Sequence, residues 1–161
     1  MAVKIQSDQI QNLQQLEVVV AGPKDANRLF FIDGQFDSDL VVSSLSNNAR
    51  SNKEIFTALI GPVFTDKQFV RAIATASLTK TVVDYPERAS AQPLATGAAW
   101  KILGVDGDWD DESGQVELRI EAQVTSKGAG QEVAILGIGF HVTILAAIAT
   151  PPPPFTVPRF V

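Results

Sequence analysis

Residues 115–124 read QVELRIEAQV, and apolar and polar side chains alternate throughout this stretch. Strict alternation over ten residues is the period of a β-strand with one buried and one solvated face. Upstream, Trp100 begins an extended arm that runs into the polar stretch 106–114, whose Asp, Gly and Ser residues are typical of a turn. Residues 100–124 therefore predict a β-hairpin packed on a core through one face.

The next apolar run, residues 133–149, reads VAILGIGFHVTILAAIA and carries no formal charge. It is shorter than the roughly 20 residues that a membrane helix needs. Its Val, Ile, Phe and Thr residues favour a strand that is buried on both faces. We expect a central strand over 132–150 and no membrane span. We also expect the link 126–130 to be a hairpin loop joining this strand to the preceding one.

Shorter apolar runs at 16–21, 28–32 and 40–45 are separated by Gly, Pro, Asn and Asp, which indicates further strands. Asp33 and Gly34 are expected to end the second of these runs. The Thr and Val content of 68–83 favours a strand over a helix.

Few segments have a helical pattern. A short helix is expected at 7–15 or 52–59, although 54–60 also fits a strand. The predicted fold is all-β: an antiparallel β-sandwich or jelly-roll of about seven to nine strands, with at most one or two short helices. It forms one domain over 1–150, followed by a proline-led extended tail over 151–161.

Composition excludes several classes of function. The chain has 161 residues, with 13 basic and 18 acidic side chains, a net charge of -5 and a pI near 4.8. This acidity argues against nucleic acid as a partner. The absence of cysteine excludes disulfides, thiol nucleophiles and cysteine zinc sites. We expect no cofactor, with calcium as the one exception considered below.

The amino-terminal segment 1–15 carries Gln, Asp, Asn and Ser where a secretory signal would have a basic start and a continuous apolar run. We therefore expect no signal peptide. The expected location is the cytoplasm or an assembled particle.

The densest cluster of acidic residues lies between the two arms of the hairpin. Oxygen-bearing side chains spaced at alternate positions, with a further glutamate on the following strand, resemble the ligand order of a calcium loop. The match is partial, because Asp111 stands where that loop requires glycine. An acidic, solvated turn is the alternative interpretation. The candidate calcium ligands are Asp106, Asp108, Asp110, Glu112 and Glu117.

Other chemistry has weaker support. His141 is the only histidine, and it could act as a base or ligand only if an oxygen partner reached it from another strand. The alternative is a partly buried histidine satisfied by a hydroxyl or a backbone group. Trp109 is expected to be exposed and could stack on a sugar, whereas Trp100 is expected in the core. No catalytic site is visible, so we expect no enzyme.

The leading functional hypothesis is a non-enzymatic structural subunit that self-associates into a homo-oligomeric ring, particle or filament, such as a virion-like or tail-like component. It depends on a mean hydropathy of +0.12, a low charge density and apolar residues beyond the proline run. The predicted interface residues lie in the tail: Pro151, Pro154, Phe155, Val157 and Phe160. The alternative is a small binding module that recognises calcium, a glycan or a peptide through the 106–114 loop.

Overall fold

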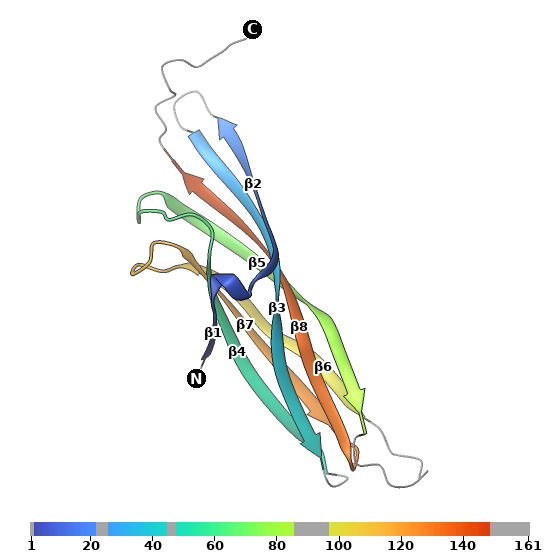
Figure 1. The fold of residues 1–161 in the computed structure, drawn as a ribbon. Coiled ribbons are helices and arrows are strands. Elements are labelled where there is room, and N and C mark those ends of the chain that lie inside the picture. Colours follow the sequence, from blue (N-terminus) through green and yellow to red (C-terminus); the bar gives the residue numbers. More distant parts are fainter. Residues whose placement is uncertain (1, 22–25, 45–47, 86–96, 149–161) are drawn as a thin grey trace.

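The computed structural model describes residues 2–21, 26–44, 48–85 and 97–148. Strands dominate, and the one helical element described is the 3-10 turn η1 at Ser7–Gln9. The strands are β1 (Ala2–Ile5), β2 (Gln11–Ala21), β3 (Ala26–Ser44), β4 (Arg50–Ile60), β5 (Phe69–Asp84), β6 (Ala98–Trp109), β7 (Val116–Ser126) and β8 (Gln131–Ala147). Two four-stranded sheets, in the orders β1-β4-β7-β6 and β2-β3-β8-β5, form the predicted all-β sandwich (Figure 1).

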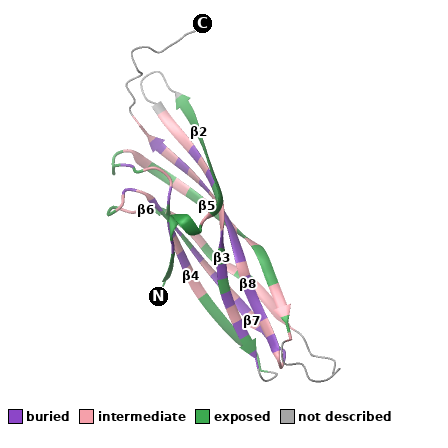
Figure 2. Cartoon of the chain, in the orientation of Figure 1, coloured by how far each residue is buried: buried purple, intermediate pink, exposed green. Residues whose placement is uncertain are grey.

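The core lies between the inner faces of the two sheets. On β7 the alternation of the sequence becomes alternation of burial, since Val116, Leu118 and Ile120 are all at most 1% exposed. Phe36 of β3 and Phe56 of β4 meet across the sandwich with ring centroids 5.5 Å apart. Figure 2 shows the buried residues concentrated on β3, β7 and β8. The predicted hairpin is confirmed as β6 paired with β7 in an antiparallel ladder.

The apolar run 133–149 supplies most of β8. It is hydrogen-bonded to β3 on one side and to β5 on the other. This position confirms the predicted central strand. Among the described residues, no helix combines the length and the apolar character needed to cross a bilayer.

Strand β3 corrects the expectation of a break at Asp33 and Gly34. The ladder continues through both residues, with Gly34 opposite Phe140 and Asp33 opposite His141. A Cβ at position 34 would lie 2.6 Å from the Phe140 ring, so glycine makes room for that ring rather than ending the strand. The irregularity comes later, between Asp37 and Leu40, where Asp39 has a φ of 51°.

The link between β7 and β8 is not as expected, and the short helix is reduced to a single turn. The link 126–130 is not a hairpin loop, because β7 and β8 belong to different sheets and the link crosses between them. Of the two segments considered for a short helix, 52–59 lies within β4, where every residue pairs with β7, so the strand alternative for 54–60 is confirmed. Of the helix expected at 7–15, only η1 forms, and the chain enters β2 at Gln11. In each case tertiary strand pairing overrides a weak local preference.

Strand β2 stands apart from the sandwich. Among the elements that the structure describes, it contacts almost nothing except β3, and each residue from Gln11 to Val20 is exposed. In Figure 1 it projects at the top of the molecule together with the start of β3 and the end of β8.

Candidate functional site

The acidic turn between β6 and β7 is held by its own hydrogen bonds. Asp110 accepts hydrogen bonds from the backbone N–H and the hydroxyl of Ser113, at 2.9 and 2.6 Å. These hydrogen bonds to Ser113 hold the pKa of the Asp110 carboxyl below its ordinary value of 3.8. Gly114, with a φ of 77°, closes the turn by donating its N–H to the Asp110 carbonyl. Asp110 therefore has a structural role in this turn.

The five predicted calcium ligands are only partly brought together. Asp110, Glu112 and Glu117 line an open groove of about 570 Å³, which Lys4 of β1 also lines. Asp106 and Asp108 do not line it; they pair across the ladder with Arg119 and Glu117.

Within the described ranges, no three His, Asp or Glu side chains are grouped so as to hold a metal ion. The structure therefore gives the calcium hypothesis no assembled ligand set.

Both tryptophans are anchored on the core side of β6. The Trp109 indole N–H donates to the carbonyls of Phe64 and Gly114, at 3.2 and 3.0 Å. The Trp100 indole N–H donates to the carbonyl of Ala134 on the opposite sheet, at 2.9 Å. The expectation of an exposed Trp109 ring is wrong, because this ring packs against the core. Neither indole lies as a free platform for a sugar.

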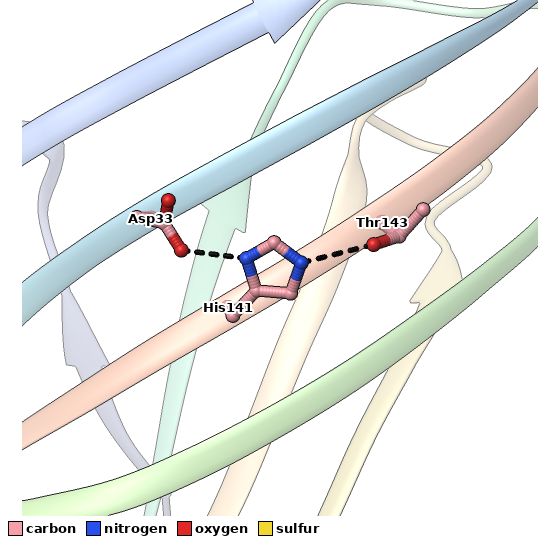
Figure 3. A network of polar contacts seen from close by, with 3 residues as sticks. All are labelled: Asp33, His141 and Thr143. Atoms are coloured by element: carbon pink, nitrogen blue, oxygen red, sulfur yellow. Dashed lines mark hydrogen bonds and ion pairs between the residues drawn. The ribbon is translucent and has the colours of Figure 1, made fainter.

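His141 does have an oxygen partner on another strand. Its Nδ1 lies 2.6 Å from Asp33 Oδ1 on β3, and its Nε2 lies 3.0 Å from Thr143 Oγ1 on β8 (Figure 3). The order carboxylate, imidazole, hydroxyl resembles a catalytic relay. However, Thr143 lies between β3 and β5, so its backbone is committed to ladders and supplies no oxyanion hole. The network instead braces two strands.

A row of polar residues crosses the outer face of sheet β2-β3-β8-β5 at His141. The strand register places Gln14, Asp33, His141 and Thr75 side by side in that order. This polar row marks a boundary. On the side toward the projecting end of the sheet, the outer face becomes apolar.

Two further rows make up this apolar surface. In the first, Leu16, Phe31, Thr143 and Ile73 lie side by side across the four strands. In the second, Val18, Leu29, Leu145 and Arg71 do the same. We call the apolar members of these rows the outer patch: Leu16, Val18, Leu29, Phe31, Ile73 and Leu145.

The outer patch is open to solvent. Leu16 is 61% exposed, Ile73 53% and Val18 39%, and the other three members are partly exposed. The inner faces of β3 and β8 are covered, since Phe30, Ile32 and Ile144 are at most 3% exposed. These two strands are thus apolar on both faces, but the described residues cover only one of them, a pattern typical of interaction surfaces.

The outer patch was not predicted from the sequence, although a signal for it was present. Residues 28–32 read RLFFI and 16–20 read LEVVV, so apolar residues occupy consecutive positions on both strands. Consecutive apolar residues in a strand indicate that both of its faces are covered. The predicted tail interface, from Pro151 to Phe160, lies outside the described residues. Its attachment point, Ile148, follows β8 at the same end of the sheet.

Comparison with known proteins adds no relative: no family model, no curated protein and no solved structure matches this chain.

Proposed function

We propose that the protein is a non-enzymatic structural subunit that self-associates through the projecting end of sheet β2-β3-β8-β5. The single observation that carries the proposal is the outer patch, an apolar surface that spans four strands and is open to solvent. Soluble monomers rarely leave a contiguous apolar surface of this kind uncovered. Covering it with other copies removes apolar side chains of four strands from water.

Charge supports the choice of this end of the molecule. Each copy carries a net charge of -5, so copies repel one another wherever acidic residues face each other. The two apolar rows contain one charged residue, Arg71, and no acidic residue. Contact through the outer patch therefore avoids most of this repulsion. Whether such contacts close into a ring or particle or continue as a filament depends on the rotation between neighbouring copies.

Light scattering behind size exclusion tests the proposal. The wild-type chain is compared with Leu16→Lys, which places a charge in the outer patch, and with Leu103→Lys as a matched control. Leu103 is also an exposed leucine on an edge strand, but it lies on β6, away from the patch.

We expect a wild-type mass that is a multiple of 17.3 kDa, a lower mass for Leu16→Lys and an unchanged mass for Leu103→Lys. A wild-type monomer at all concentrations contradicts the proposal. An equal loss of mass in both variants contradicts the location of the interface.

A further inference from the structure

The two sheets have four edge strands, and three of them carry features that block further pairing. β1 has only four residues. β5 has register shifts near Phe69, Leu78 and Lys80, and β6 has one near Ile102. β5 and β6 also contact each other across the sandwich. Short length, bulges and cover are the usual devices that prevent edge-to-edge association.

The fourth edge, β2, is neither short nor bulged over most of its length, and its one charged side chain in residues 14–21, Glu17, is ion-paired with Arg28 of β3. Its single register shift lies between Gln11 and Gln14, and from Gln14 to Ala21 the ladder with β3 is regular. This eight-residue segment reads QQLEVVVA, with one charged residue and no proline. Its second backbone edge faces away from β3, which is the one strand that pairs with it among the described residues. A regular, apolar, unpaired edge is a template for strand addition.

The structure points to a second copy of the same strand as the occupant. We propose that β2 pairs antiparallel with β2 of another protomer about a twofold axis at Val18. This pairing joins sheet β2-β3-β8-β5 of each protomer into one eight-stranded sheet. This inference rests on the proposed function and deepens it by naming the contact that builds the first dimer. A twofold contact of this kind is closed, because each edge is used once.

The charge on Glu17 selects the register. Directly opposed residues of an antiparallel pair point to the same face of the sheet. One residue of β2 must therefore lie at the twofold axis, opposite its own copy. An axis at Glu17 would set Glu17 opposite its own copy, and like charges directly opposed are destabilising. An axis at Val18 sets Glu17 opposite Val19 of the second copy and sets Leu16 opposite its Val20. Glu17 also keeps its ion pair with Arg28 of β3, at 3.0 Å.

This register makes the outer patch continuous across the dimer. Leu16 and Val18 of the two protomers line the seam, and Ile73 lies toward the far edge of each sheet. Two outer patches then form one apolar surface twice as wide. The dimer can stack through this surface into larger assemblies, so β2 pairing and patch burial are successive contacts.

Disulfide trapping tests the register, and the chain is suited to it because it contains no cysteine. Three single variants are compared under mild oxidation: Val18→Cys, Leu16→Cys and Leu103→Cys. In the proposed register, position 18 faces itself, within the 4.4–6.8 Å Cα separation that a disulfide spans. Position 16 lies about 13 Å from its copy, because four residues at about 3.3 Å each separate them along the strand. Leu103→Cys measures the background cross-linking that random collision produces.

We expect Val18→Cys to form a covalent dimer in high yield, at least about tenfold above Leu16→Cys and Leu103→Cys, on non-reducing gels. Each variant is first checked by light scattering in reducing buffer. Oligomers that do not cross-link preferentially at position 18 overturn the β2 contact but leave the proposed function standing. Monomers in reducing buffer, for the wild type as well as the variants, overturn both.

Discussion

Gly34 on β3 lies directly opposite Phe140 on β8, and the Phe140 ring occupies the space that a side chain at position 34 would need. A Cβ there would lie 2.6 Å from the ring and 2.8 Å from Ile10. Because Phe140 is only 5% exposed, the ring has little freedom to move aside.

Gly34→Ala is therefore expected to lower the free energy of unfolding by about 1–3 kcal/mol, the usual cost of overpacking a core. Gly104→Ala is the matched control, because a Cβ at Gly104 of β6 meets nothing within 4 Å. Urea unfolding followed by tryptophan fluorescence measures both. Equal stability of the two variants would show that Phe140 does not need the space at Gly34.

The Asp110 turn gives a prediction about pH. The pKa of Asp110 is lowered in the folded state, so its hydrogen bonds to Ser113 stabilise the fold above the ordinary pKa of 3.8. That contribution is lost as the pH falls from 3.8 through the lower folded-state pKa. Asp110→Asn should melt at a lower temperature than the wild type at pH 7, and the difference should shrink below pH 3.8.

Asp111→Asn serves as the control, because Asp111 is an exposed carboxylate in the same turn. Its melting temperature should follow that of the wild type at both pH values. A difference between Asp110→Asn and the wild type that stays constant from pH 7 to pH 3 would refute the role given to the ionised carboxylate.

Calcium is expected to leave the melting temperature unchanged. Asp110 is engaged by Ser113, and Asp106 and Asp108 lie outside the groove that Glu112 and Glu117 line. A ligand that binds only the folded state at 100 times its Kd would add about 2.7 kcal/mol to stability. Calorimetry with calcium, and with magnesium as the control, would detect this. A calcium-specific rise that Asp108→Asn abolishes would contradict the structural interpretation of the turn.

The carboxyl-terminal segment provides a prediction about assembly. Residues 149–161 follow Ile148 at the end of sheet β2-β3-β8-β5 that carries the outer patch. The described residues already form a core that joins both sheets. Deleting Pro151 to Val161 should therefore weaken association while the melting temperature of the domain is kept. Unchanged assembly after the deletion, measured by light scattering, would remove this segment from the interface.

The parts of the fold that the sequence predicts are those with a local cause. On β7, one buried and one solvated face produce the alternation Val116, Leu118, Ile120, which is readable in ten residues. The central position of β8 follows from the apolar run itself. The continuity of β3 through Gly34 was not predictable in this way, because its cause is the Phe140 ring, a partner far along the chain.

The candidate sites were less predictable for the same reason. The spacing of the acidic residues is a property of the sequence, whereas the hydrogen bond from Ser113 to the Asp110 carboxylate depends on the closed turn. The outer patch depends on the register of four strands, which sets Leu16, Phe31 and Ile73 in one row. Consecutive apolar residues indicated a covered face, but only the pairing shows that the face lies open.

Hydrogen exchange of β2 at low and high protein concentration tests the central claim most directly. Association through the free edge of β2, at the projecting end of the sheet, predicts that deuterium uptake by peptides covering 14–21 falls as concentration rises, because the amides that face away from β3 become hydrogen-bonded. Peptides covering 103–109 of β6 should keep the same uptake and serve as the internal control. Uptake by residues 14–21 that is the same at every concentration would contradict association through the free edge of β2.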